Sequence, residues 1–291
     1  MNKTLKLFPS VTGTPICRAA SPLRPTWLRP LLESYGVRMR QLIFITMLLL
    51  WGCSSSPKSR ISEINLINEH TVEYIGDTSK DNAKQLEVIL TKHPNKIDTL
   101  VVTSTGGEVF GGMHIGRLVH KFGLKVVVER YCMSSCANYI VTASNDVIVS
   151  KGALLGWHGG STQPIYSTLE AEISWLSQIK RFFSNTDDNK EGNTYLLRWQ
   201  KEELKFFDTV GVNQAVTILG MMPGLKNKRD SMLFSYDKKT LQYLGLNIKF
   251  ENEEQIEFSP DGTKAVQVFN ITNEKLDALL KLHNRKINKD T

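Results

Sequence analysis

Cysteine is scarce in this sequence, and so are the side chains that could join it at a metal site. The 291 residues include four cysteines, of which Cys17 and Cys53 lie in an N-terminal leader. Cys132 and Cys136 remain, without a second Cys/His pair at ligand spacing. The sequence therefore gives no indication of a metal centre, and no motif in it predicts a cofactor.

Long hydrophobic runs are also missing. The longest, residues 42–51, is too short for a stable membrane-spanning helix. It follows Met39-Arg40 and ends in Leu50-Trp51-Gly52-Cys53, which resembles the lipobox of bacterial lipoproteins. The resemblance implies that 39–53 is a signal, cleaved before Cys53, and that a lipid on this sulfur holds the exported protein at a membrane. The alternative of a buried core helix is disfavoured by the basic residues before the run and the Gly-Cys-Ser-Ser-Ser that ends it.

The segments on either side of this signal have little structure-forming pattern. Residues 1–38 contain half of the ten prolines, which prevents a long helix. We interpret them as lying upstream of a true start at Met39, the alternative being a disordered or transit-type extension. The serines that follow the lipobox predict a flexible tether over 54–69. For a Gram-negative host, Ser54 in place of an aspartate after the lipobox cysteine indicates the periplasmic face of the outer membrane.

A net excess of charge of one sign is nearly absent from residues 54–291. The formal net charge is +7, but residues 1–53 carry seven basic residues against Glu33 alone. Residues 54–291 are therefore left with a net charge of +1. A nearly neutral domain gives no reason to expect nucleic acid as a partner, although a basic tail that binds it remains an alternative.

Short apolar runs and amphipathic stretches alternate from residue 71 to residue 157. β-Branched or apolar runs predict strands, and apolar residues three or four positions apart predict helices. The predicted strands are 71–75, 98–103, 125–129, 146–149 and 153–157, and the predicted helices are 77–92, 109–122 and 134–143. This alternation predicts an α/β fold with a mainly parallel sheet, in which ligands collect at the carboxyl ends of the strands.

The pattern changes beyond residue 160. Apolar spacing predicts helices over 169–183 and 195–207, separated by a polar break at 185–193, and a third helix from Asn213 to Leu219. Residues 233–236 lead into a predicted helix at 237–243. The predicted elements that follow are a strand at 246–250, a hairpin of 255–258 with 265–269, a helix at 273–282 and a polar tail at 284–291.

Three short pieces between residues 103 and 160 carry the candidate chemistry. They are Ser104-Thr105-Gly106-Gly107-Glu108-Val109, Cys132-Met133-Ser134-Ser135-Cys136 and Gly156-Trp157-His158-Gly159, and each lies at or just beyond the end of a predicted strand.

Acyl transfer needs a nucleophile, a base and donors aimed at the developing oxyanion. We interpret Ser134 as the nucleophile, His158 as the general base, and the backbone of Gly106 and Gly107 as the oxyanion loop. Each piece alone also fits a structural role, as a turn, a helix cap or a surface histidine. Their order and spacing together favour the catalytic interpretation.

Segment 98–160 resembles the Clp protease proteolytic subunit and its relatives in the Clp/crotonase superfamily, including the signal peptide peptidase A type. These relatives have a Ser/Asn-x-Gly-Gly-x-Val loop, a serine in a small-residue turn before a helix, and a histidine after the next two strands. The matching positions are 104–109, Ser134 and His158. The Cys132-x-Ser134-x-Cys136 frame resembles exported members in particular.

The resemblance covers roughly 70–250 and leaves 251–291 as a C-terminal hairpin and helix. It implies a fold of repeated β-β-α units and a serine endopeptidase activity on peptide or protein substrates. We expect this activity to be independent of ATP, because an exported protein has no ATP to use and nothing in the sequence suggests an ATPase docking surface. It also implies that the helices of 168–219 form an arm through which copies of the chain associate as a homo-oligomer.

The chain departs from the family at the third catalytic residue, an acid that orients the histidine. It should lie a few residues before Asp230, where this sequence has Lys226-Asn227-Lys228. Asp230 or Asp208 are the candidate substitutes, and Ser135 competes with its neighbour as the nucleophile.

This departure leaves a second hypothesis open, a catalytically inactive Clp-fold module for binding or assembly in the cell envelope. Thioester chemistry of the crotonase kind is a weaker third, because coenzyme A is not expected outside the cytoplasm. A Cys132–Cys136 disulfide is compatible with export and with a separation of one helical turn, and the sequence leaves it open.

Overall fold

The computed structural model describes residues 62–166, 188–225, 231–252, 255, 257–258 and 262–290. All of them belong to one compact unit, Arg60–Thr291. Three sequence predictions lie outside the described residues: the signal with Cys53, the helix at 169–183 and the candidate acid Asp230. Within these described ranges, no helix combines the length and the apolar character needed to cross a membrane.

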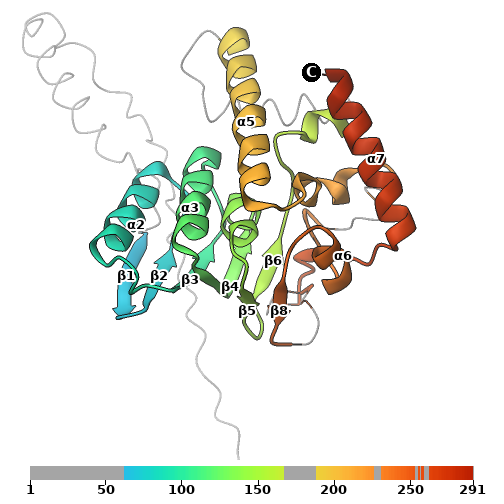
Figure 1. Cartoon of the computed structure of the whole chain (residues 1–291). Coiled ribbons are helices and arrows are strands. Elements are labelled where there is room, and N and C mark those ends of the chain that lie inside the picture. The colour runs from blue at the N-terminus through green and yellow to red at the C-terminus, as the bar shows by residue number, and fades with distance from the viewer. Residues whose placement is uncertain are drawn as a thin grey trace, which may run out of the picture. The chain divides into compact units, whose positions relative to one another are not determined.

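The main sheet is mostly parallel, as the alternation of strands and helices predicted (Figure 1). Its order is β1-β2-β3-β4-β5-β8, with β6 also paired to β4, and only the β1–β2 pair is antiparallel. The strands are β1 (Glu63–Asn68), β2 (Thr71–Ile75), β3 (Thr99–Ser104), β4 (Lys125–Met133), β5 (Val147–Val149), β6 (Leu154–Gly156) and β8 (Ile248–Phe250).

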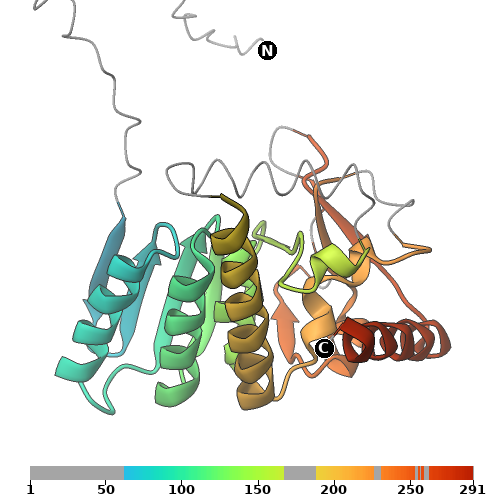
Figure 2. The same ribbon diagram turned by 90° about the horizontal axis from the view of Figure 1, so that it is seen from above.

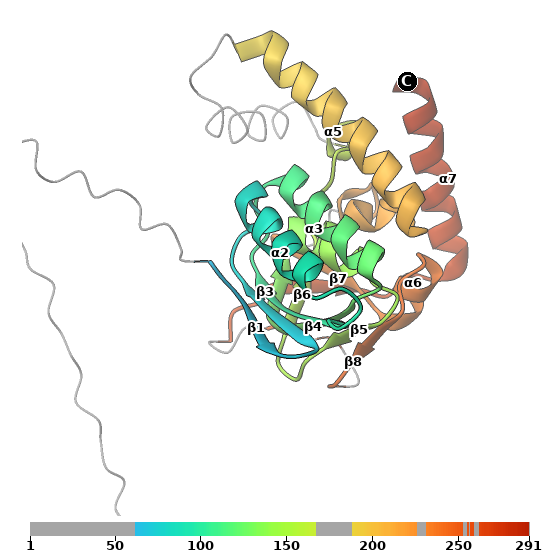
Figure 3. The ribbon, with the colours of Figure 1, turned by 60° about the vertical axis from the view of Figure 1, so that its left-hand side comes forward.

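Three helices lie side by side over one face of this sheet, as Figure 2 shows from above: α2 (Lys80–Lys92), α3 (Val109–Phe122) and α5 (Asp188–Val210). Alternate residues of the strands, among them Leu100, Val102 and Val126, are fully buried. The apolar stripes of α2 and α3 supply the matching buried residues. The first turns of α5 extend beyond the sheet (Figure 3).

A second, smaller sheet pairs β7 (Leu233–Tyr236) with β9 (Val266–Phe269) in parallel. The remaining helices are α6 (Lys238–Tyr243), α7 (Asn273–Asp290), the π-helical turn η1 (Cys136–Ile140) and the 3₁₀ turns η2 (Val141–Ala143), η3 (Gln163–Tyr166), η4 (Gln214–Thr217) and η5 (Leu219–Met221). Reciprocal backbone hydrogen bonds of 2.8 Å between Trp157 and Phe234 join the end of β6 to β7.

Several predicted boundaries were wrong, because tertiary pairing overrides local composition. Residues 63–68 form β1 against β2, so the predicted tether does not extend through 69. The predicted polar break at 185–193 overlaps the first turns of α5, and the predicted polar tail continues α7 to Asp290. The described residues of the predicted hairpin include an antiparallel bridge, Phe258 to Lys264, while β9 pairs with β7.

Candidate active site

The two central candidates, Ser134 and His158, follow the ends of neighbouring strands. β4 and β6 run parallel with Met133 opposite Gly156, so the residues beyond them emerge at the same edge of the sheet. There the Nε2 atom of His158 lies 2.7 Å from the Oγ atom of Ser134, within hydrogen-bonding distance. His158 is exposed and Ser134 is half-buried, which leaves the pair open to a substrate.

Ser134 occupies a turn that few residues adopt. Its φ is +56°, one of two positive values among the described non-glycine residues, and this left-handed conformation costs roughly 1–2 kcal/mol. Its N–H donates to the Gly156 carbonyl at 3.0 Å, and its carbonyl accepts from the Asn138 N–H at 2.8 Å. The turn thus ends β4 and leads into η1.

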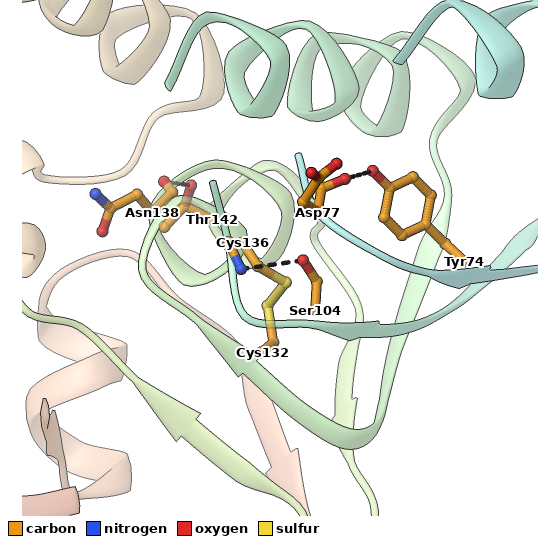
Figure 4. The surroundings of a disulfide bond; sticks show 8 residues. Tyr74, Asp77, Ser104, Cys132, Cys136, Asn138 and Thr142 are labelled. Carbon is orange, nitrogen blue, oxygen red and sulfur yellow. Dashed lines mark hydrogen bonds between the residues drawn. A yellow bond between two sulfur atoms is a disulfide. The ribbon is translucent and has the colours of Figure 1, made fainter. Parts of the chain in front are cut away.

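A disulfide brackets this turn. Cys132, on β4, is bonded to Cys136, the first residue of η1, with their Cα atoms 5.3 Å apart. Both half-cystines are fully buried. Figure 4 shows Ser104, at the end of β3, beside the bridge. The bond links the strand to the helical turn across Ser134.

The glycine loop packs directly against the same turn. Gly106 has a φ of +88°, and a methyl group there would lie 2.7 Å from the Ser134 Cβ and 2.8 Å from the Ser135 nitrogen. The Gly106 N–H donates to the Ser104 Oγ at 3.1 Å. Among the residues that the structure describes, none accepts a hydrogen bond from the Gly107 N–H. Gly107, rather than Gly106, therefore offers the donor.

The competing nucleophile Ser135 lies in a different environment. Its side chain is buried, and its Oγ donates to the Gly107 carbonyl at 3.0 Å. This hydroxyl holds the glycine loop, whereas Ser134 faces the histidine. The Ser135 N–H lies at the start of η1, where helical N–H groups have no intrahelical partner.

Of the two candidate acids, Asp208 lies within the described residues. Asp208 is exposed on α5, and its side chain has no hydrogen bond or ion pair to another described residue. Asp230 lies outside the described residues, so its role stays a prediction.

Sequence reasoning missed one residue, Glu203. It is completely buried on α5, between Trp199 and Phe206 on the same face of the helix. Its carboxylate accepts from Tyr139, in η1, and from Ser161, in the loop after His158. Burial raises the pKa of the Tyr139 hydroxyl well above its usual value, and the nearby charge of Glu203 is the second largest cause. A charged residue within an apolar helical stripe was the signal available in the sequence.

A hollow of about 420 Å³ lies at the opposite end of the sheet. Asp98, Thr99 and Lys125, at the amino ends of β3 and β4, are among its lining residues. It is separate from the Ser134–His158 pair. Within the described ranges, no three His, Cys, Asp or Glu side chains gather as they would around a metal ion.

No protein-family model and no curated protein matches this chain. Solved structures do. A ClpP1 mutant from Listeria monocytogenes is 15% identical, over 62% of this chain and 90% of its own, with a TM-score of 0.40. A mutant of the 1510-N membrane-bound stomatin-specific protease is 13% identical, over 71% of this chain and 99% of its own, with a TM-score of 0.35. An enoyl-CoA hydratase/isomerase from Marinobacter aquaeolei is 13% identical, over 34% of this chain and 52% of its own, with a TM-score of 0.25.

These structural neighbours are Clp protease and crotonase-fold proteins. At such low identities the likeness concerns the fold alone. The chain itself has a mixed α/β fold with a mostly parallel sheet and a row of helices over one face.

Proposed function

We propose that this protein is an exported, lipid-anchored serine peptidase of the Clp-like type. The observation that carries the proposal is the 2.7 Å contact between the Ser134 Oγ and the His158 Nε2. It is supported by the left-handed turn at Ser134 and by the glycine loop beside it. A hydroxyl at a strand end, next to an imidazole and to backbone donors, is the arrangement that acyl transfer needs.

In this mechanism His158 accepts the proton of the Ser134 hydroxyl as its oxygen attacks the scissile carbonyl. The tetrahedral oxyanion is stabilised by the N–H groups of Gly107 and Ser135. His158 then gives the proton to the leaving amine, and an acyl-enzyme remains on Ser134. Water, deprotonated by His158, hydrolyses this ester and regenerates the hydroxyl.

The membrane attachment rests on the sequence from Met39 to Cys53. Growth with a radiolabelled or alkyne-tagged palmitate tests it, because the expected lipid is on Cys53. Label should enter the full chain and be lost in Cys53→Ala. Equal labelling of both proteins would contradict the anchor while leaving the peptidase proposal intact.

A fluorophosphonate probe tests the chemistry, because it reacts with serines whose hydroxyl is activated. We expect the full chain to be labelled, Ser134→Ala to lose labelling, and His158→Ala to be labelled at a much lower, still measurable rate. Ser135→Ala is the matched control, since it removes a neighbouring hydroxyl that does not contact the histidine. Labelling that persists in Ser134→Ala, or none in the wild type, would contradict the peptidase proposal.

One observation favours a second candidate, an inactive module for binding or assembly in the cell envelope. Asp208, a candidate third residue, is exposed on α5, and its side chain has no hydrogen bond or ion pair to a described residue. If the module is inactive, Ser134→Ala leaves the cellular phenotype intact, while changes in the arm, 168–219, abolish it. Loss of the phenotype in Ser134→Ala would exclude this candidate.

We also propose that copies of the chain associate through the arm. Leu197 and Leu204, two turns apart on α5, are 59% and 50% exposed. Exposed leucines on one helical face are typical of a contact between proteins.

A further inference from the structure

Glu203 combines three properties that are rarely found together. It carries an ionisable carboxyl group, its side chain is completely buried, and no ion pair joins it to a described cation. A carboxylate taken out of water costs several kcal/mol unless hydrogen bonds replace its hydration. The donors around it therefore show what it does.

Four hydrogen bonds converge on this carboxylate. Oε1 accepts from the Tyr139 hydroxyl at 2.6 Å. Oε2 accepts from the Ser161 N–H at 2.9 Å, from the Ser161 hydroxyl at 2.5 Å and from the Gln214 amide at 2.8 Å. An ionised carboxylate has about four acceptor positions and no donor, so it matches this set of donors.

Two of these donors lie on the segments that carry the reactive pair. Tyr139 is the fourth residue of η1, which begins two positions after Ser134. Ser161 is three positions after His158, in the same loop. Trp199, one turn before Glu203 on α5, also donates to the Tyr139 hydroxyl, at 2.8 Å. One face of α5 thus holds the nucleophile segment and the base segment together.

A second contact joins the same two segments directly. The Asn138 amide donates to the Gly159 carbonyl at 2.9 Å, next to His158. Asn138 is buried, and its N–H bonds the Ser134 carbonyl. The loop at 158–161 is therefore held at Gly159 by η1 and at Ser161 by Glu203.

We propose that Glu203 is a positioning residue for the Ser134–His158 pair. Its carboxylate fixes the loop of His158 against η1, so that Nε2 stays within hydrogen-bonding distance of the Ser134 hydroxyl. This inference rests on the proposed peptidase function. Glu203 does not touch the reacting atoms, and it acts through Ser161 and Tyr139.

The first test is the kinetics of fluorophosphonate labelling in the full chain. Glu203→Gln keeps the volume but turns an amide NH₂ toward groups that are themselves donors. We expect the maximal labelling rate to fall 10- to 100-fold, because misplacing a base by about 1 Å costs about 100-fold in rate. The probe concentration that gives half of the maximal rate should change less than about twofold. Glu202→Gln is the matched control: this neighbour is partly exposed and pairs with Arg117. It should label at the wild-type rate.

A double-mutant comparison separates positioning from general destabilisation. If Glu203 acts through the base, Glu203→Gln adds no further loss to His158→Ala. Additive losses, or a wild-type rate in folded Glu203→Gln, would overturn the proposal. Ser161→Ala is the milder variant if Glu203→Gln fails to fold. It removes one hydroxyl donor, retains the backbone donor, and should slow labelling in the same manner.

A crystal structure of Glu203→Gln, or of Ser161→Ala in its place, tests positioning without relying on activity. We expect the distance from the His158 Nε2 to the Ser134 Oγ to exceed 3.5 Å in the variant. An unchanged 2.7 Å contact would overturn the inference even if the wild type is active. Absence of labelling in the wild type would instead contradict the proposed function, and the crystal distance would still decide the role of Glu203.

Discussion

Reduction of the Cys132–Cys136 disulfide should weaken both the fold and the reactivity of Ser134. The bond closes a loop with a sequence separation of four. The chain-entropy relation for a loop of about five residues gives roughly 2 kcal/mol of stabilisation at 25 °C. Each kcal/mol shifts the melting temperature of a domain of 150–250 residues by about 2–4 °C. The unit Arg60–Thr291 falls in this size class, so we expect the reduced protein to melt about 4–8 °C lower.

The effect on Ser134 follows from its backbone conformation. The turn has a φ of +56° and lies between the two half-cystines. If reduction lets the turn relax by about 1 kcal/mol, within the usual range for such strain, labelling should slow roughly fivefold.

The assay compares oxidised protein with protein refolded under reductant, by calorimetry and by fluorophosphonate labelling. Cys132→Ala/Cys136→Ala is the control, because its melting temperature should not respond to reductant. Equal melting temperatures for the two wild-type forms would refute the entropic reasoning. An unchanged labelling rate would refute the idea that the bridge holds the turn.

Three further predictions follow from other parts of the structure. Gly106→Ala should abolish labelling of Ser134, because its methyl group would lie 2.7 Å from the Ser134 Cβ. Gly123→Ala, at a position with nothing within 4 Å of the added methyl group, is the control, and calorimetry compares the stability of the two variants. Labelling of Gly106→Ala at the wild-type rate would contradict the close packing. Burial lowers the pKa of His283 to about 4. As the pH falls, the unfolded state therefore binds the proton before the folded state does. About 3 kcal/mol of folding stability should be lost between pH 6.5 and pH 4. Urea unfolding of His283→Leu should lack this loss, and an unchanged pH dependence would exclude His283 as its source. The double variant Leu197→Lys/Leu204→Lys should dissociate an oligomer held by α5, as measured by analytical ultracentrifugation. Lys201→Glu on the same helix replaces one charged residue by another and is the control for an effect of charge alone.

Local sequence pattern was sufficient for the elements that lie closest to the candidate site. The helices at 80–92 and 109–122 and the strand at 99–104 were predicted within a few residues. Their apolar residues recur with the period of the element, and this period depends only on neighbouring residues. The order of strands and helices also predicted a parallel sheet, and hence the edge where ligands collect.

Other elements could not be predicted, because their partners are distant in sequence. β9 pairs with β7, more than 30 positions earlier, although its nearest turn signal indicates a hairpin. The segment after Ser134 was predicted as an ordinary helix, yet it forms a π-helical turn followed by a 3₁₀ turn. A disulfide at its first residue and close packing against α3 act on that segment, and neither is visible in local composition.

The sequence by itself determined which side chains stand at strand ends, and so proposed Ser134, His158 and the glycine pair. Only the tertiary structure decided which of them meet. The register of β4 against β6 sets Ser134 beside His158, while packing leaves Ser135 to hold the glycine loop. Glu203 became visible only in three dimensions, since its donors come from η1, the histidine loop and η4. Residue types and local periods are short-range properties, whereas register and buried hydrogen bonds depend on contacts between segments that folding alone brings together.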